Sequence, residues 1–316
     1  MNAGSVRPPL VTGAAGFIGS HLVDALIAAG ERPVAVDTAR AWAASRNLAG
    51  QDGRFEQVAL DLVGQDVPAW LAGRQPGTIF HLSGFASVPA SVREPRRDFE
   101  RNALATLNLL EAVRLASPAS RVVFTSSAAV YGEGRGVPFR EDDPTSPVAP
   151  YAVSKLAAER YVDVYARMYG LRTASVRLFP NYGPRLRAHV VYDLMCKVRD
   201  NPRELVIEGD GRQVRDFVYV SNTVDALRLL AEAAPLRGEV YNLGADEPVT
   251  ITRVAELICE RMRVSPRFSY TAGVAPGVSL SWIADTARLR AIGYVPRVQL
   301  AVGLSKTVTW FCQALS

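Results

Sequence analysis

The stretch Val11-Thr12-Gly13-Ala14-Ala15-Gly16-Phe17-Ile18-Gly19-Ser20-His21-Leu22 decides the fold of this chain. In it, a short apolar strand passes through Gly13, Gly16 and Gly19 into residues with helical hydrophobic spacing. The first N–H groups of a helix have no partner within it, and together with the helix dipole they form a site for a pyrophosphate. Because glycine has no Cβ, a phosphate can approach the main chain closely. The G-x-x-G-x-x-G pattern in this setting predicts a dinucleotide-binding turn.

A second apolar strand, Val34-Ala35-Val36-Asp37, ends in a carboxylate 18 residues after Gly19. A carboxylate at this place accepts hydrogen bonds from the ribose of adenosine in dinucleotide-binding folds. The same charge repels a 2′-phosphate, so Asp37 favours NAD over NADP. Arg40 follows closely in the sequence and moderates this preference.

Composition is that of a globular protein. The 316 residues are enough for about two domains, and 48% of them are hydrophobic and 21% charged. No run of about 18 apolar residues is present, so we expect no membrane segment. The polar residues 1–9 lead directly into the glycine turn and leave no room for a signal peptide. These features predict a cytoplasmic protein.

Charge and cysteine content exclude several other classes. The net charge of +5 comes from scattered basic residues, which fits an anionic small molecule better than a nucleic acid. The three cysteines, Cys196, Cys259 and Cys312, are odd in number and widely spaced. We therefore expect buried free thiols, with neither a disulfide framework nor a metal site.

Up to about residue 178, apolar strands alternate with helical patterns. The predicted strands are 7–11, 34–37, 55–60, 78–82, 122–125 and 174–178, and the predicted helices are 16–29, 41–48, 97–115 and 151–169. Pro8 and Pro9 are poor members of a central strand, so we expect the first strand to start late. This alternation predicts an α/β fold with a Rossmann-type doubly wound parallel sheet.

After residue 178 the pattern changes to short strands and frequent proline, glycine and arginine. Strands are predicted at 205–207, 216–220 and 239–242. We expect a dinucleotide-binding domain over 1–178 and a smaller α+β substrate domain over 179–316. A helix at 221–234 is expected to pack on the first domain.

The segment Tyr151-Ala152-Val153-Ser154-Lys155 opens a predicted long helix. Residues four apart share one helix face, so we expect the Lys155 ammonium to favour the Tyr151 phenolate and to lower its pKa from about 10. The spacing is common on helices, but here it uses one of only three lysines. Ser127 ends a predicted core strand, where its hydroxyl can bond the same substrate oxygen. The set predicts hydride transfer at a carbinol, with Tyr151 taking the proton and NAD the hydride.

In combination, these motifs resemble the extended short-chain dehydrogenase/reductases, a family of nucleotide-sugar epimerases and dehydratases. The resemblance covers essentially the whole chain and rests on residues 12–19, 81–84, 151–155, 177–185, 209–211, 215–220 and 241–244. It implies NAD as cofactor, a nucleoside-diphosphate sugar as substrate, and Ser127, Tyr151 and Lys155 as catalytic residues. It also implies a homodimer that pairs through the helices at 97–115 and 151–169.

Pattern and resemblance together assign further site residues. By resemblance, Asp61 and Leu62 flank the adenine, Phe179 and Pro180 lie near the nicotinamide, and Arg215 lies near the substrate diphosphate. The cofactor-binding residues that we expect are Gly13, Ala15, Gly16, Phe17, Ile18, Asp37, Asp61, Leu62, Leu82, Ser83, Gly84, Tyr151, Lys155, Phe179 and Pro180. The expected substrate contacts are Ser87, Ser127, Asn181, His189, Val206, Arg215 and Trp282.

The residues after Ser127 distinguish reactions within the family. Dehydratases that resemble this chain carry an acid there, and 3,5-epimerases and epimerase-reductases carry a cysteine, whereas this chain has Ala128 and Ala129. The resemblance therefore implies a 4-epimerase acting through a transient 4-keto sugar, on a UDP-linked hexose of the glucose/galactose type. The alternatives are a 4-keto reductase or dehydrogenase of the same family and a nucleotide-sensing protein without turnover.

Three positions depart from the family pattern. Residues 275–278 stand where relatives carry an arginine for the diphosphate and an acid for the ribose, and Pro180 and Phe85 replace more polar residues. Candidates to compensate for the missing arginine are Arg185, Arg187 and His189. Trp282 stands where the family borders the C2 substituent of the sugar, so it is expected either to exclude an N-acetyl group or to be a core tryptophan.

Overall fold

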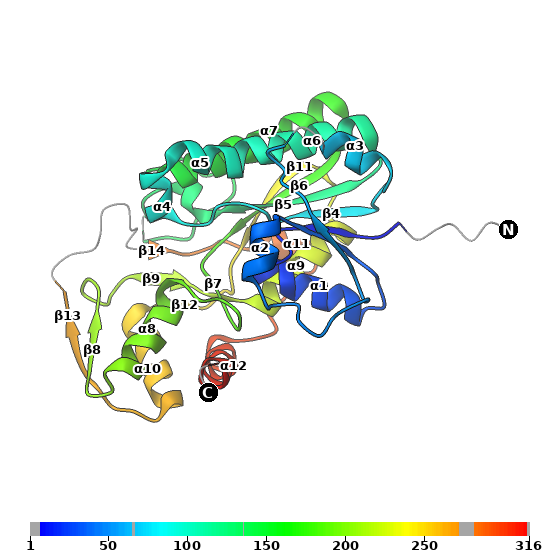
Figure 1. Cartoon of the computed structure of the whole chain (residues 1–316). Helices are drawn as coiled ribbons and strands as arrows, with labels where there is room; N and C mark the ends of the chain where they lie inside the picture. The colour runs from blue at the N-terminus through cyan, green and yellow to red at the C-terminus, as the bar shows by residue number, and fades with distance from the viewer. Residues whose placement is uncertain (1–6, 65–66, 135, 272–280, 315–316) are drawn as a thin grey trace. The chain divides into compact units, whose positions relative to one another are not determined.

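The computed structural model describes residues 7–64, 67–134, 136–271 and 281–314 (Figure 1). It divides into two compact units. The first unit comprises residues 1–130, 147–177 and 224–241, and the second comprises 131–146, 178–223 and 242–316. The chain therefore passes between the units several times. The sequence pattern predicted a boundary after residue 178 and a helix at 221–234 that rejoins the first domain, but it did not predict that residues 131–146 belong to the second unit.

The first unit is built on a seven-stranded sheet with the order β11-β6-β5-β4-β1-β2-β3. Its strands are β1 (Leu10–Thr12), β2 (Val34–Asp37), β3 (Glu56–Ala59), β4 (Thr78–His81), β5 (Arg121–Ser127), β6 (Arg172–Leu178) and β11 (Arg237–Leu243). The pairs β1–β2, β1–β4, β2–β3 and β4–β5 are parallel. From β3 to β6 this is the strand order of a doubly wound dinucleotide-binding fold, which confirms the predicted fold class.

The central strand β1 begins at Leu10, after the two prolines, as expected. Proline has no N–H to donate to a ladder, so the strand starts where donors become available on both sides. Leu10 pairs with Val34 of β2 and Ile79 of β4. The carboxyl end of β1, where the glycine turn begins, therefore lies at the middle of the sheet edge.

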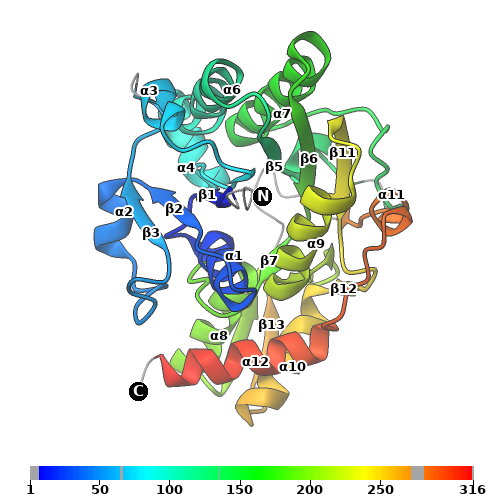
Figure 2. The ribbon, with the colours of Figure 1, turned by 90° about the vertical axis from the view of Figure 1, so that its right-hand side faces the viewer.

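Helices cover both faces of this sheet. Figures 1 and 2 show α3, α6 and α7 on one face and α1 and α9 on the other. The helices of this unit are α1 (Phe17–Ala28), α2 (Ala39–Ala44), α3 (Val67–Ala72), α4 (Val88–Arg93), α5 (Pro95–Phe99), α6 (Ala105–Ala116), α7 (Pro150–Tyr169) and most of α9 (Val220–Ala233). Leu10, Ile79, Leu109 and Phe124 are at most 1% exposed in the core between the sheet and α6.

Two helices differ from the sequence prediction. The helix predicted at 41–48 ends at Ala44, and Ser45 and Asn47 turn back instead to bond the glycine turn. The helix predicted at 97–115 begins at Pro95 and contains a π-helical turn, Glu100–Leu104, between α5 and α6. Such turns arise from one widened hydrogen-bond register and are frequent at functional sites.

The second unit consists of small sheets and helices. The sheets are β10 (Val218–Tyr219) with β7 (Asn181–Tyr182), β12 (Pro248–Thr250) with β9 (Val214–Asp216) and β14 (Ser281–Trp282), and β13 (Arg267–Tyr270) with β8 (Glu204–Ile207). Its helices are α8 (His189–Asp200), α10 (Ile251–Met262), α11 (Ala287–Ala291) and α12 (Leu300–Gln313).

Two predicted strands of the second part have different places in the structure. The strand predicted at 216–220 is split into β9 and β10, which belong to separate sheets. The strand predicted at 239–242 is β11, which extends the large sheet. The sequence pattern did not show this because short apolar runs carry no information on their partner strand.

The three cysteines are free, but only Cys259 is buried; Cys196 is partly exposed and Cys312 is exposed. The prediction of three buried thiols was therefore wrong for Cys312, which lies in the last turn of α12. Within the described residues, no helix combines the length and the apolar character needed to cross a bilayer.

Candidate cofactor and catalytic site

The glycine turn has the geometry of a phosphate cradle. Gly13 has a φ of +71°, a conformation that glycine adopts without strain. A Cβ on Gly19 would lie 2.1 Å from the carbonyl oxygen of Gly13, so α1 packs against the turn only because this residue is glycine. Gly16 occupies the N-cap of α1 and provides no side chain to cap the first turn. The N–H groups at the start of α1, including those of Phe17 and Ile18, therefore suit an anion.

Asp37 at the end of β2 is tied to this turn. Its carboxylate accepts hydrogen bonds from the N–H groups of Ala15 at 3.1 Å and Thr38 at 2.8 Å. Burial raises the pKa of Asp37, and these two hydrogen bonds oppose the rise. The segment just after α2 also holds the turn, because Ser45 Oγ and Asn47 Nδ2 donate to the carbonyl of Ala15 at 2.8 and 3.0 Å. The sequence pattern did not reveal Ser45 and Asn47, since a loop polar residue carries no signal of its partner.

The other expected cofactor residues of the first unit follow β3 and β4. Asp61 is exposed and forms an ion pair with Arg101 at 2.6 Å, while Leu62 beside it is buried. Leu82 and Ser83 continue β4, and their N–H groups both bond Thr12 Oγ1 at 3.2 Å. Because parallel strands end at the same edge of a sheet, these residues and the glycine turn share that edge.

The structure brings Ser127 and Tyr151 together. Ser127 is the last residue of β5 and Tyr151 is in the first turn of α7, and the Ser127 hydroxyl is near enough to lower the pKa of Tyr151. The Tyr151 N–H donates to Ser91 Oγ at 3.1 Å, which fixes the start of α7 against α4. The arrangement places two hydroxyls side by side at the carboxyl end of the sheet.

Lys155 lies one turn further along α7 and is only 5% exposed. Its Nζ donates to the carbonyl oxygen of Thr125 at 2.8 Å and lies 4.8 Å from the centre of the Phe124 ring. Burial lowers the pKa of Lys155 to about 8, and the charge of Asp98 opposes this shift. The amine therefore changes charge close to physiological pH.

The pKa of Tyr151 shifts in the direction opposite to the prediction. Burial raises it, the hydrogen bond with Ser127 lowers it, and the charge of Asp98 raises it further. The sequence prediction considered only the spacing from Tyr151 to Lys155. It missed the cost of burying a phenolate, and it missed the nearby anion, Asp98.

A buried polar chain below these residues also went unpredicted as a unit. His81 at the end of β4 is 1% exposed and bonds Thr12 Oγ1 at 2.8 Å and Thr106 Oγ1 at 3.0 Å. Burial and the charge of Lys155 lower the pKa of His81 to about 3, so the ring is neutral. Asn102 and Asp98, both at most 1% exposed, continue the chain.

In the second unit, Phe179 is 1% exposed and Pro180 partly exposed, just after β6. Asn181 donates from Nδ2 to the carbonyl of Phe179 at 2.7 Å and accepts a hydrogen bond from Thr223. Its amide is thus engaged on both sides. Asn181 serves the local fold in this structure, which leaves Pro180 without an adjacent free amide to replace the asparagine of relatives.

Arg215 and Trp282 lie together on neighbouring strands β9 and β14. Arg215 is 7% exposed, and its guanidinium lies 5.1 Å from the centre of the Trp282 ring and donates to the carbonyl of Val214 at 2.8 Å. Burial lowers the pKa of Arg215 to about 10, so it remains a cation at neutral pH. Trp282 Nε1 donates to the carbonyl of Gly132 at 3.2 Å, so the ring is held at its edge.

Three expected substrate residues are not brought into either cluster. Ser87 is the N-cap of α4 in the first unit and accepts a hydrogen bond from the Ala90 N–H at 3.3 Å. Val206 is 41% exposed on β8, and His189 is exposed with a φ of +67° at the start of α8. The segment 275–278 lies outside the described residues, as do its neighbours from 272 to 280.

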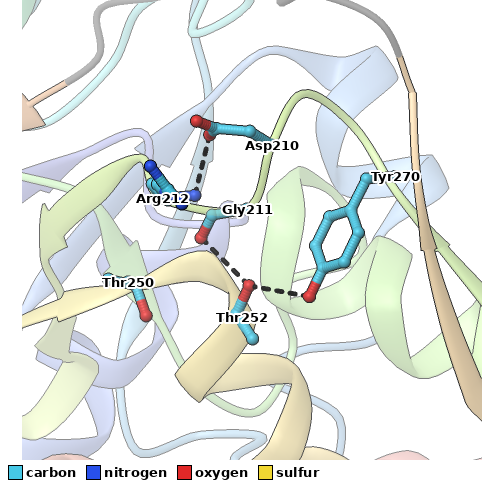
Figure 3. A pocket seen from close by; sticks show the side chains of 6 residues that line it. All are labelled: Asp210, Gly211, Arg212, Thr250, Thr252 and Tyr270. Carbon is cyan, nitrogen blue, oxygen red and sulfur yellow. Dashed lines mark hydrogen bonds between the residues drawn. The ribbon is translucent and has the colours of Figure 1, made fainter.

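A cavity of about 700 Å³ lies within the second unit (Figure 3). It is lined by Asp210, Gly211, Arg212, Thr250, Thr252 and Tyr270. Figure 3 shows Thr252 between the Gly211 carbonyl and the Tyr270 hydroxyl, to which its Oγ1 is bonded at 3.1 and 3.4 Å. None of the site residues predicted from the sequence lines this cavity.

A doubly wound sheet with a glycine turn after its central strand, a carboxylate after the next strand and a Ser/Tyr/Lys set defines a dinucleotide-dependent short-chain dehydrogenase/reductase type of protein. The chain belongs to the NAD dependent epimerase/dehydratase family, whose model matches residues 9–244. NAD is its cofactor, and the glycine cradle and Asp37 fit it.

Relatives with different substrates resemble the chain closely. It is 34% identical to the UDP-glucose 4-epimerase of Mycolicibacterium smegmatis, over 96% of this chain and 97% of the relative. A UDP-N-acetylglucosamine 4-epimerase from Methanobrevibacter ruminantium, in complex with UDP-N-acetylmuramic acid, superposes with a TM-score of 0.87 at 32% identity, over 98% and 99% of the chains. A variant UDP-glucuronic acid 4-epimerase from Bacillus cereus, in complex with UDP-4-deoxy-4-fluoro-glucuronic acid and NAD, superposes with a TM-score of 0.88 at 28% identity. The match covers 97% of this chain and 99% of that one.

Proposed function

We propose that this protein is an NAD-dependent 4-epimerase of a nucleoside-diphosphate hexose, with a UDP-sugar of the glucose/galactose type as its substrate. The observation that carries the proposal is the placement of Ser127, at the end of β5, beside Tyr151, in the first turn of α7, with the Lys155 amine one turn along the same helix. These groups suit proton transfer at a sugar alcohol. The three relatives described above are all 4-epimerases by name, which supports the same reaction.

In the proposed reaction, Tyr151 as phenolate takes the proton of the C4 hydroxyl, while Ser127 bonds the same oxygen. NAD, held by the glycine turn and Asp37, would supply a reversible acceptor for the hydride of the C4–H bond, so no cofactor would be consumed. Between the two transfers, the keto sugar rotates so that the other face of its C4 carbonyl points to the cofactor. Tyr151 then gives its proton back to the C4 oxygen. The Lys155 ammonium stabilises the phenolate through its positive charge.

The second unit supplies the recognition residues in this proposal. Arg215 binds the diphosphate through a guanidinium that is already buried and oriented over Trp282. Trp282 occupies the space beside C2 of the sugar and disfavours an N-acetyl group. Val206 and His189 contact the nucleotide or sugar. With Asn181 engaged locally, Arg185 and Arg187 are the further candidates for anion contacts.

Ala128 and Ala129 follow Ser127 and are 1% and 7% exposed. Neither side chain can transfer a proton, so dehydration at C5 and C6 has no acid or base at this position. A 4-keto reductase of the same family would need the same Tyr151 and Ser127. It differs in consuming reduced cofactor, which makes the two functions separable in solution.

The test is a panel of nucleoside-diphosphate sugars mixed with the NAD-loaded protein. We expect UDP-glucose or UDP-galactose to raise the melting temperature most and to interconvert with no net change in nicotinamide absorbance. Stoichiometric cofactor turnover with a 4-keto sugar would establish the reductase instead. Binding without conversion of any sugar would leave a nucleotide-sensing protein.

We also propose that the protein forms a homodimer through α6 and α7. Apolar side chains recur along the outer face of α7 at helical spacing, and they are at least 41% exposed: Val153, Tyr161, Val164 and Met168. Leu115 on α6 is 61% exposed as well. A second copy covering this face is expected to give twice the chain mass of 34.2 kDa in light scattering, and Val164→Glu is expected to return the mass to one chain.

A further inference from the structure

Asp98 is a fully buried carboxylate that the proposed reaction does not use. It lies in α5, is 0% exposed, and accepts a hydrogen bond from Asn102 Nδ2 at Oδ1 over 2.9 Å. Burial raises its pKa, while nearby Ser154, the hydrogen bond from Asn102 and the charge of Lys155 lower it. A buried charge is costly unless it is paired, so its presence beside the catalytic helix needs a reason.

Asn102 transmits the position of Asp98 to the cofactor side of the sheet. It lies in the π-helical turn, and its Oδ1 accepts the N–H of Phe85 at 3.0 Å. A Cβ on Gly84 would lie 2.6 Å from Asn102 Oδ1 and 3.4 Å from Lys155 Nζ. The amide of Asn102 and the amine of Lys155 therefore both lie against Gly84. Asp98 holds the amide in the orientation that presents its oxygen there.

The hydrogen-bond directions in the chain are determined by one bond. Thr106 Oγ1 donates to the carbonyl of Asn102 at 2.6 Å, so it must accept from His81 Nε2. His81 Nδ1 then accepts from Thr12 Oγ1, whose oxygen in turn accepts from the N–H groups after β4. The chain thus links the start of the glycine turn to Asn102 and Asp98, with neutral His81 in its middle.

The ionisable groups that face this site come from three elements: Asp98 of α5, His81 of β4, and Tyr151 and Lys155 of α7. Of these, Asp98 supplies the negative charge, and His81 is neutral. The Asp98 carboxylate favours the ammonium of Lys155 and disfavours the phenolate of Tyr151. It therefore raises the pKa of both groups, opposing burial for the lysine and adding to it for the tyrosine.

We propose that Asp98 is a positioning residue whose buried carboxylate orients Asn102 against Gly84 and keeps the Lys155 amine protonated in the working enzyme. This inference rests on the proposed function for its place in a reaction. The part of the inference that concerns the charge state of Lys155 can be measured without any catalytic turnover. It also assigns a role to the π-helical turn, which places the Asn102 side chain where it contacts both Phe85 and Asp98.

The first experiment follows the lysines by NMR in protein labelled with ¹³C at Cε. Only Lys155, Lys197 and Lys306 contribute, and Lys155→Arg assigns the buried one. In Asp98→Asn we expect the Lys155 titration to move down by about one pH unit, a shift typical of losing one nearby charge. Asp98→Glu, which keeps the charge, is expected to titrate near the wild type. Lys197 and Lys306 serve as internal controls.

The second experiment is the pH profile of kcat/KM on the best UDP-sugar. Both limbs of the Asp98→Asn profile are expected to move to lower pH, because the pKa values of Tyr151 and Lys155 both fall. Asp163→Asn removes a carboxylate of α7 that pairs with Arg167, and this control is expected to leave both limbs in place. A merely structural role for Asp98 would lower the melting temperature and leave the profile unshifted.

An unmoved Lys155 titration in Asp98→Asn overturns the proposal. So does failure of both Asp98→Asn and the smaller Asp98→Ser to fold, since Asp98 would then be required for the structure itself. If the titration shifts but no sugar is converted by the wild type, the charge role of Asp98 is supported and the proposed function fails. The two failures are therefore distinguishable.

Discussion

The two units of this protein present their candidate site residues in different ways. In the first unit, backbone groups and buried side chains form one connected set, from the Gly13 turn through His81 to Asp98. In the second, Arg215 and Trp282 contact each other, and each donates a hydrogen bond to a backbone carbonyl. The first arrangement tolerates little change because each group satisfies the next. In the second arrangement, the side chains that contact substrate can be replaced with fewer consequences for their neighbours.

Two of the three departures from the family pattern follow the same division. Pro180 and residues 275–278 belong to the second unit, whereas the third departure, Phe85, belongs to the first. Ser127, Tyr151 and Lys155, which the resemblance carries without change, belong to the first. We infer that the first unit sets the chemistry and the second sets the substrate. The predictions below test that division, starting with the largest effect.

Removing the Tyr151 hydroxyl is expected to have the largest effect on turnover. Tyr151→Phe deletes the only group assigned to take the C4 proton, and general-base loss typically lowers kcat by about 10²–10⁴-fold. KM for the sugar is expected to stay within a few-fold, because recognition is assigned to the second unit. Steady-state kinetics over a range of substrate concentrations separate the two constants.

Tyr161→Phe is the matched control for this change. Tyr161 lies on the same helix but is 41% exposed, and it should retain full activity. Wild-type turnover in Tyr151→Phe would end the assignment of the catalytic residues. A raised KM with normal kcat would instead show that the first unit contributes to recognition.

The buried chain in the first unit predicts an acid-sensitive stability. The pKa of His81 is about 3 in the folded protein, against about 6.5 when unfolded, so between these values only the unfolded chain binds the proton. Stability is therefore lost as pH falls from 6.5 toward 3, at up to about 1.4 kcal/mol per pH unit from this group. In His81→Gln that component is absent.

The measurement compares urea unfolding of wild type and His81→Gln at several pH values. We expect the variant to be less stable at pH 7 and the gap to narrow as the pH is lowered below 6.5. If the free energies of unfolding of the two proteins changed with pH in parallel across this range, His81 would take up its proton in the folded state as readily as in the unfolded one.

Much of the first unit could be predicted from the sequence because its signals are local. The glycine turn, the acid after β2 and the Tyr151/Lys155 spacing each depend on residues close in the chain, and the sheet follows from the alternation of elements. The late start of β1 follows from two prolines alone. The placement of β11 and residues 131–146 depends on contacts between distant segments, which no local pattern records.

The environment of the site was harder to predict than its members. Nothing in the sequence separates Asp98 from a surface acid in an arginine-rich helix, and only the packing of α5 shows that it is buried. The prediction for the Tyr151 pKa therefore had the wrong sign. Similarly, Asn181 looked available for substrate, but its amide is used by Phe179 and Thr223. Burial and long-range partners were the missing information in each case.

In the second unit, Arg215→Gln is expected to weaken substrate binding with little effect on the chemical step. Loss of one charged contact to a phosphate costs about 1.5–3 kcal/mol, which corresponds to about 10–150-fold in KM. The nearby Arg212 is exposed just before β9, and Arg212→Gln is expected to leave KM within two- or three-fold. Competition by UDP alone should report the same ratio. An unchanged KM in Arg215→Gln would move the diphosphate site to Arg185 or Arg187.

The smallest expected effect concerns which sugar is preferred. If Trp282 borders C2, the wild type should turn over UDP-glucose faster than UDP-N-acetylglucosamine, and Trp282→Ala should improve the relative kcat/KM of the N-acetyl sugar by about tenfold, typical of opening a small pocket. Trp282→Phe keeps a ring under Arg215 and is expected to change the preference less, which separates lost bulk from lost packing of the guanidinium. Equal rates on both sugars in the wild type would make Trp282 a packing residue and would leave the division between chemistry and recognition resting on Arg215.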